Sequence, residues 1–403
     1  MSQPRLLSFT LDGWTALGGE VSISLVDRVG VLVGKNGAGK SAILEGFEAI
    51  SSWAIGRSRR SRMLGSDSIP RILDIEILTP NKRRLEYRYE LIPLPASIDD
   101  PDIDDSTSEN SEESSFTWND YCQYIDGDKE RLWTTEVGVT TLHNNSEPNI
   151  TILGNTNSLR ESPLPENSQL KLPLEMQWVY AVLKGVRFLG KAPVRIPQKR
   201  RPSLLKVSRR GIDPSLFGLA DHLARKILRR IGTEELDELE SVCKRIGLAS
   251  KITVQKLFLS EGSGEASRNG DEEYLAFVLL DGVNIGLLSD GTLRVLSILI
   301  DIIPSSLNAT IIIEEPETQI HPGMLAKLLN EIQVYTFDEN LLISTHSPQV
   351  VSWTSPDKLN LVYRDHGRTK IRKLQEGEIN KVVEYLREEG DLGEWLYSGI
   401  LDE

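Results

Sequence analysis

One glycine-rich segment limits what this chain can fold into more than any other. Residues 29–33 (VGVLV) form an apolar run of the kind found in strands that are buried on both faces. This run leads directly into Gly34–Ser41, whose letters GKNGAGKS match the phosphate-loop pattern, and the residues that follow are apolar at helical spacing. A strand, a glycine-rich loop and a helix in this order predict an α/β fold.

The residue types of this loop suit a phosphate group. Its three glycines allow the backbone to turn so that N–H groups converge, and the start of the helix adds the positive end of its dipole. We expect Lys40 to reach the β- and γ-phosphates of ATP and Ser41 to bind Mg²⁺. The candidate nucleotide-binding residues of the loop are Gly34, Lys35, Asn36, Gly37, Ala38, Gly39, Lys40 and Ser41.

Two adjacent carboxylates form a second candidate site. Residues 309–313 (ATIII) predict a buried strand, and Glu314 and Glu315 follow it directly. Two carboxylates at the end of a buried strand are costly to desolvate unless a cation or a proton compensates them, and Mg²⁺ is the natural cation here. We therefore expect Glu314 to orient the metal ion and Glu315 to act as the general base that polarises the attacking water.

Two further short segments lie in the same half of the chain. Residues 288–292 (LSDGT) stand at the head of a predicted apolar helix, where an ordinary Ser or Asp N-cap is one interpretation. Residues 344–348 (STHSP) follow a predicted strand, and a lone histidine such as His346 is commonly structural. The functional interpretation of both segments depends on their order along the chain with the loop and the carboxylate pair.

In this order, the four segments resemble the motifs of the ABC-type ATPases. Residues 288–292 are similar to the signature Leu-Ser-Gly-Gly-Gln, with Asp and Thr in place of one Gly and the Gln, and residues 344–348 are similar to the switch region. The resemblance implies that Ser289 and Gly291 bind the γ-phosphate held by the other subunit, and that His346 contacts the γ-phosphate. The candidate catalytic residues are Glu315 and His346, and the candidate metal ligands are Ser41 and Glu314.

The run EEPETQIHP at residues 314–322 brings the resemblance closer to the OLD-like, RecF-like and SMC-like ATPases, which include subunits of antiphage systems. The fold it implies is an α/β ABC-ATPase head with a mixed β-sheet, an antiparallel β portion and an inserted helical subdomain. The long interval between loop and signature argues against a transporter subunit, and it lacks the sustained heptads of a long coiled coil. The first candidate for the family's Q-loop glutamine is Gln123.

Composition excludes several other classes of protein. Two cysteines in 403 residues are too few for a disulfide scaffold or a four-cysteine zinc site. No apolar run approaches the roughly 20 residues of a membrane span, and no secretory signal is present, so we expect a cytoplasmic protein with no membrane contact. Residues 97–115 carry −8 of the net charge of −13, and this polar tract is expected to be a disordered loop.

Two basic segments are the candidate contacts for DNA. Residues 184–210 carry ten basic side chains and no acidic one, and residues 57–62 carry four arginines. Lys and Arg without intervening acids can neutralise phosphates and release counterions. The alternatives are a solvated surface or a contact for a partner protein.

These signals divide the chain into five stretches. We expect the N-terminal part of the ATPase head with its phosphate loop (1–95), the acidic loop (96–115), a β-rich continuation (116–170), a helical and basic insertion (171–250) and the C-terminal part of the head (251–403). The pattern also predicts one strand over residues 132–142, one helix over residues 174–189 and a helix near the C-terminus.

The resemblance implies a head-to-tail homodimer that acts as a switch, in which ATP holds the two subunits together and hydrolysis releases them. Because the sequence shows no effector domain, we expect the chain to control a separate effector in antiphage defence, such as a Toprim or HNH nuclease or a toxin. One alternative is a RecF-like repair or recombination ATPase without an effector. Another is a scaffold that binds ATP with little turnover.

Overall fold

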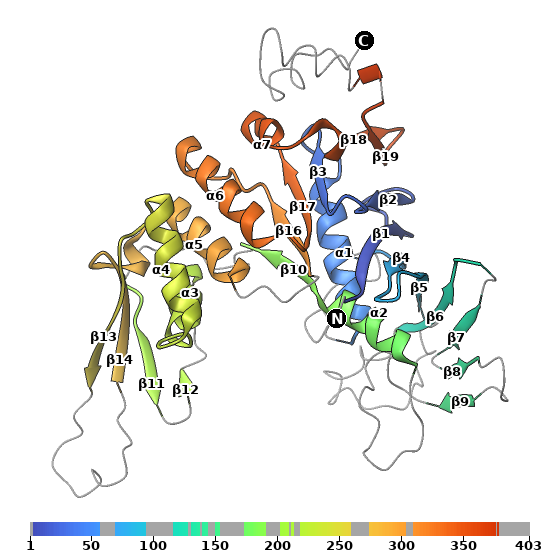
Figure 1. The fold of residues 1–403 in the computed structure, drawn as a ribbon, viewed down its shortest axis with the longest axis horizontal. Coiled ribbons are helices and arrows are strands. Elements are labelled where there is room, and N and C mark those ends of the chain that lie inside the picture. Colours follow the sequence, from blue (N-terminus) through green and yellow to red (C-terminus); the bar gives the residue numbers. More distant parts are fainter. Residues whose placement is uncertain are drawn as a thin grey trace, which may run out of the picture. The chain divides into compact units, whose positions relative to one another are not determined.

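The computed structural model shows two compact units (Figure 1). The first consists of Met1–Arg187, Ser306–Ile312 and Asp338–Glu403, and the second of Phe188–Ser305 and Ile313–Phe337. The described residues are 3–56, 69–93, 116–127, 130–137, 139–143, 150–153, 173–190, 202–208, 211–212, 218–258, 274–303, 309–375 and 377–378. The five stretches expected from the sequence remain a prediction.

An antiparallel sheet forms one layer of the first unit. Its eight strands are β1 (Arg5–Asp12), β2 (Val21–Ser24), β4 (Ile72–Leu78), β5 (Arg84–Pro93), β6 (Phe116–Tyr124), β7 (Arg131–Glu136), β8 (Val139–Leu142) and β9 (Ile150–Leu153). They lie in the order β2-β1-β4-β5-β6-β7-β8-β9. Along β4, buried Leu73, Ile75 and Ile77 alternate with half-buried residues, which is the period-two pattern of a sheet with one buried face.

The second sheet has a parallel centre. Its strands are β3 (Val29–Val33), β10 (Val186–Leu189), β16 (Thr310–Glu314), β17 (Asn340–Thr345), β18 (Leu359–Asp365) and β19 (Arg368–Lys373), in the order β10-β16-β17-β3-β18-β19. β3 pairs in parallel with β17 on one side and with β18 on the other. Four of its five residues are buried, as its unbroken apolar sequence predicts.

A helix that follows the glycine-rich loop joins the two sheets of this unit. Helix α1 (Lys40–Ala54) contacts β1 and β4 of the antiparallel sheet and β17 of the mixed sheet. The rings of Phe9 in β1 and Phe47 in α1 stack with their centroids 3.9 Å apart. Gly46 is required on this face, because a Cβ there would lie 2.6 Å from the ring of Trp14. The described part of the unit also contains α2 (Leu174–Lys184) and α7 (Pro348–Trp353), with a 3-10 turn at Pro356–Lys358.

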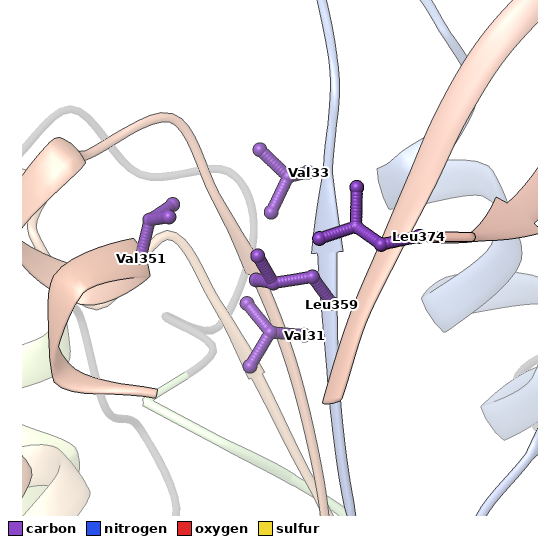
Figure 2. Close-up of a cluster of buried hydrophobic side chains, with 5 residues drawn as sticks. All are labelled: Val31, Val33, Val351, Leu359 and Leu374. Carbon is purple, nitrogen blue, oxygen red and sulfur yellow. The ribbon is translucent and has the colours of Figure 1, made fainter. Parts of the chain in front are cut away.

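A small apolar cluster fixes β3 against its C-terminal neighbours (Figure 2). The cluster joins two residues of β3 to α7, β18 and the segment after β19, and its members are Val31, Val33, Val351, Leu359 and Leu374. All five side chains are buried. Burial of aliphatic side chains contributes roughly 1.5–3 kcal/mol each, so this cluster holds the end of β3 firmly in place.

The second unit combines a small antiparallel sheet with four helices. The strands are β11 (Leu205–Ser208), β12 (Gly211–Ile212), β13 (Ile252–Phe258), β14 (Tyr274–Leu280) and β15 (Val283–Asn284). The helices are α3 (Leu219–Leu228), α4 (Glu234–Ile246), α5 (Asp290–Ile302) and α6 (Pro322–Tyr335), with a 3-10 turn at Ile285–Leu287. Ion pairs join α3 to α5 through Lys226 and Asp301, and α4 to α6 through Arg245 and Glu331.

The predicted fold class is confirmed, because the chain has a mixed sheet, an antiparallel β portion and a separate group of helices in the second unit. Two element predictions are wrong. Residues 132–142 form the hairpin β7–β8, since Val137 adopts a positive φ of 49° and reverses the chain. Residues 174–189 form α2 and then β10, because the helix ends at Gly185 and the next four residues join the mixed sheet.

Several other predictions lie outside the described residues. They are the acidic loop at 97–115, the basic cluster at 57–62, the C-terminal helix, and, within the basic run, residues 191–201 and 209–210. Among the residues that the structure describes, no helix is both long and apolar enough to cross a bilayer.

Stability should depend on pH through a buried carboxyl group at the start of β17. Burial raises the pKa of Glu339 to about 7, although a hydrogen bond from the Ala309 N–H opposes the shift. The native state therefore holds this proton more tightly than the unfolded state does. The stabilisation is complete below about pH 4.5 and is lost as the pH rises through about 7.

Glu339→Gln keeps an acceptor for the Ala309 N–H and removes the titration. The unfolding free energy of the parent should fall between pH 5 and 7.5, and we expect a smaller fall in the variant. The difference between the two falls should be on the order of 1–3 kcal/mol. Urea unfolding at a series of pH values measures it. Asp357→Asn is the matched control, because that carboxylate is exposed and is not among the groups that shift the pKa of Glu339. Parallel profiles for the parent and Glu339→Gln would contradict the assignment.

Candidate functional site

The first unit brings two of the predicted segments to one edge of the mixed sheet. In the parallel pairing of β17 with β3, Thr345 lies beside Val33, and in that of β18 with β3, Leu361 lies beside the same residue. The chain leaves β3 at Gly34 and leaves β17 at His346. Since parallel strands end at the same edge, the phosphate loop and the switch histidine start from neighbouring positions.

Two glycines of the loop are required by close approaches of other parts of the first unit. A Cβ on Gly34 would lie 2.0 Å from the carbonyl oxygen of Val362 in β18, and one on Gly39 would lie 2.4 Å from Oγ1 of Thr369 in β19. Gly39 also has a φ of 109°, which L side chains rarely adopt. The β18–β19 hairpin therefore lies directly against the loop.

Lys40, the first residue of α1, lies inside the loop. Its side chain is 5% exposed, and Nζ donates to the carbonyl oxygens of Gly34 at 2.7 Å and Lys35 at 3.2 Å. The N-terminus of α1 has no side-chain cap and no acidic residue in its first turn. A buried ammonium group and an uncapped helix start both favour an anion at this point. Ser41, the predicted metal ligand, is exposed at the second position of the helix.

The switch segment is ordered by a bond between one of its own side chains and its backbone. Thr345 is fully buried, and its Oγ1 accepts a hydrogen bond from the N–H of Ser347 at 2.9 Å. This turn fixes the direction in which the chain leaves β17, and it leaves His346 half-buried at the sheet edge. The geometry is compatible with the predicted contact to a phosphate, which stays a prediction.

The second unit brings the other two segments together. Ser289 is the N-cap of α5, and its Oγ accepts from the N–H of Thr292 at 3.1 Å. This is the capping role that the sequence left open as an alternative. A Cβ on Gly291 would lie 2.1 Å from the carbonyl oxygen of Gln319, so the start of α5 packs against the loop that follows Glu315. This close packing explains why residue 291 is a glycine without reference to any ligand.

The predicted general base lies in a strained backbone. Glu315 has a φ of 41°, a left-handed conformation that is rare for a residue with a side chain. Its Oε2 accepts from Oγ1 of Thr318 at 3.2 Å, and its carbonyl oxygen accepts from the N–H of the same residue at 3.0 Å. These two bonds close a tight turn directly after β16. Strain of this kind is concentrated at functional sites.

An arginine that no motif indicated ties α5 to this turn. Arg294 donates from Nη2 to the carbonyl oxygen of Glu314 and from Nη1 to that of Gly190, both at 2.5 Å. Burial lowers the pKa of the Arg294 guanidinium, and the negative charges of Glu314 and Glu315 oppose that shift. The side chain was missed because its partners are backbone atoms far from it in the sequence.

Gln123 has a structural contact. It lies in β6 and is 8% exposed, and its Nε2 donates to Oε2 of Glu86 in the neighbouring strand at 2.7 Å. This cross-strand bond explains why a glutamine occurs here without any reference to a nucleotide.

Comparison with protein families decides the affiliation of the chain. A family model described as "AAA domain, putative AbiEii toxin, Type IV TA system" matches residues 30–352. The chain belongs to this AAA-domain family. The match spans the phosphate loop, the start of α5, the carboxylate pair and the switch histidine. A search of curated proteins found no match.

The solved structures that resemble this family member include three SMC head domains. The Smc head bound to the C-winged helix domain of ScpA is 12% identical with a TM-score of 0.42, and the comparison covers 93% of this chain and 99% of that one. An Smc head from Pyrococcus furiosus with an extended coiled coil, bound to the C-terminal domain of ScpA, is 10% identical with a TM-score of 0.39 over 96% and 100%. The SMC head from Thermotoga maritima is 13% identical with a TM-score of 0.36 over 92% and 99%.

The close approach at Gly34 predicts a large difference between two loop glycines. Gly34→Ala must displace the Val362 carbonyl, whereas a Cβ on Gly37 would meet nothing within 4 Å and costs only the strain of a φ of 78°. We expect losses of unfolding free energy of about 3 kcal/mol or more for Gly34→Ala and about 1 kcal/mol for Gly37→Ala. Urea unfolding of both variants measures the difference, and equal losses would show that β18 does not press on the loop as described.

Proposed function

We propose that this protein is an ATPase whose phosphate loop holds the β- and γ-phosphates of ATP. The observation that carries the proposal is the position of Lys40, buried inside the loop at the uncapped start of α1. Nothing lies within 4 Å of the position that a Cβ on Gly37 would take, so the loop is open on that side. Membership of the AAA-domain family supports the same activity.

The oxygen donors of this chain suit Mg²⁺. A serine hydroxyl at Ser41 and a carboxylate at Glu314 are hard ligands of the type that this ion prefers. When bound, the ion would neutralise charge on the phosphates of ATP. In our proposal Glu315 polarises the attacking water, and its turn, closed by Thr318, holds the carboxylate in one direction. His346 would contact the γ-phosphate.

The active form we propose is a head-to-tail homodimer with two composite sites. Each site would combine the loop of one subunit with Ser289 and Gly291 of the other. The exposed N-terminus of α5 supports this assignment, because helix starts bind anions and Ser289 presents a hydroxyl there. ATP would then hold the dimer together, and hydrolysis would release it.

The biological role we propose is a nucleotide-dependent switch over a separate effector in antiphage defence. The family description refers to a toxin of a type IV toxin–antitoxin system, which favours a role in defence over house-keeping repair. A Toprim or HNH nuclease or a toxin would be the effector, and DNA is a further candidate partner. A RecF-like repair ATPase and an ATP-binding scaffold with little turnover are the competing functions, and the turnover of the parent protein separates the scaffold from both others.

The first test concerns the general base. Glu315→Gln keeps an oxygen that can accept from Thr318 and so preserves the turn. We expect a fall in ATP hydrolysis of about 10²–10⁴-fold with ATP binding retained. Lys40→Ala is the contrasting variant, because it should lose binding as well as turnover. Hydrolysis at the parental rate in Glu315→Gln would rule out this residue as the base.

The second test concerns the composite sites. Ser289→Arg should retain ATP binding and lose turnover, because the long side chain blocks the γ-phosphate of the other subunit. Its N-cap is lost as well, at about 1 kcal/mol, so thermal unfolding must first show that it is folded. Mixed with Lys40→Ala, it should recover activity, since one site of each heterodimer then carries no substitution. No recovery at saturating concentrations of both subunits would contradict the head-to-tail arrangement.

A further inference from the structure

The phosphate loop can direct its N–H groups at a ligand only while its carbonyl groups point elsewhere and find donors. Two of these carbonyl groups, at Gly34 and Lys35, accept from Nζ of Lys40. Those of Gly37 and Ala38 accept from outside the loop. The carbonyl oxygen of Gly37 accepts from Nε of Arg364 at 3.3 Å, and that of Ala38 accepts from Oγ1 of Thr369 at 3.1 Å.

Arg364 joins three separate segments of the first unit through a single guanidinium group. Besides Gly37, it donates at 2.7 Å to the carbonyl oxygen of Ala16, between β1 and β2, and at 2.7 Å to that of Gly367 in its own hairpin. The hairpin is also joined to the β1–β2 loop by the N–H of Thr369, which donates to the carbonyl oxygen of Leu17 at 2.7 Å. A planar group with several fixed donors suits this task, and a lysine would not.

The strands that carry the two donors are held in place by pairing and packing. Arg364 and Thr369 are directly opposite each other in the β18–β19 pairing. β18 in turn pairs with β3, and the apolar cluster in Figure 2 holds both strands together. Thr369 is fully buried against Gly39. The hairpin is thus a fixed support on the outer side of the loop.

This support matters most when Lys40 changes partners. In the proposed function, Nζ of Lys40 binds the phosphates of the nucleotide, which weakens its bonds to the carbonyl groups of Gly34 and Lys35. The carbonyl group of Lys35 still accepts from the N–H of Ala38 at 3.2 Å, and the outer bonds to Gly37 and Ala38 then hold the remainder of the loop. We propose that Arg364 and Thr369 are positioning residues through which the β18–β19 hairpin sets the affinity for nucleoside di- and triphosphates.

The proposal rests on the proposed ATPase function, and a comparison of arginine and lysine variants of the same hairpin tests it. Arg364→Ala should raise the Kd for ADP and for ATP with magnesium, and the KM for ATP, each about 5–30-fold, since bonds to a charged donor are lost. The kcat at saturating ATP should stay within about twofold, because the group touches no reacting atom. Arg364→Lys should give intermediate values. Lys370→Ala, on the same exposed hairpin, removes one positive charge as well and should change none of them.

Fluorescent-nucleotide titration and steady-state kinetics on the full chain provide these numbers, and thermal unfolding confirms that each variant is folded. An unchanged Kd in Arg364→Ala, with the parent binding normally, would overturn the proposal and leave the ATPase function standing. Loss of ATP affinity with unchanged ADP affinity would also overturn it, because a direct contact to the γ-phosphate would then be indicated. A parent protein that binds neither nucleotide would overturn the ATPase function and this proposal with it.

Discussion

The placement of β3 between two parallel neighbours is the constraint on which the rest of the first unit depends. Thr345 of β17 and Leu361 of β18 are both aligned with Val33, so β3 and β17 end at one edge and the loops that follow them begin there, while β18 continues past it to Asp365. A strand in this position must be apolar on both faces, and the sequence VGVLV satisfies that requirement. Burial of Val31 and Val33 in the cluster of Figure 2 then fixes the point from which the glycine-rich loop departs.

Close packing against backbone, rather than ligand contact, explains several residues of the predicted motifs. A Cβ placed on Gly34 or on Gly291 would lie about 2 Å from a carbonyl oxygen of another segment. At both positions a segment that we propose binds ATP packs directly against a neighbouring segment, and even a methyl group would push the two apart. Glu315 shows the opposite solution, because it keeps its side chain and accepts a strained φ that Thr318 and Arg294 help to maintain.

Segments with continuous local signals were predictable, and contacts between distant backbone atoms were not. The strand at 29–33 occurs with the predicted limits, because its unbroken apolar run is what a strand buried on both faces requires. The hairpin at Val137 was missed because a residue with a side chain takes the positive φ that usually marks glycine. Arg294 and Arg364 were missed for another reason: both donate to carbonyl groups, which every residue has, so no partner is visible in the sequence.

The ammonium group of Lys40, which we propose binds the nucleotide, already donates to carbonyl groups of the loop itself. Nζ of Lys40 lies 2.7 Å from the carbonyl oxygen of Gly34, so a phosphate must compete with the loop's own backbone for the same ammonium group. The affinity for a nucleotide therefore depends on the difference between the bonds of Lys40 to the phosphates and its bonds to the carbonyl groups of the loop. It also depends on how far the loop is destabilised when the second set is broken. Because Arg364 and Thr369 bind the carbonyl groups of Gly37 and Ala38 from outside the loop, that loss stays local to Gly34 and Lys35, and in our proposal the rest of the loop keeps its shape when a phosphate binds.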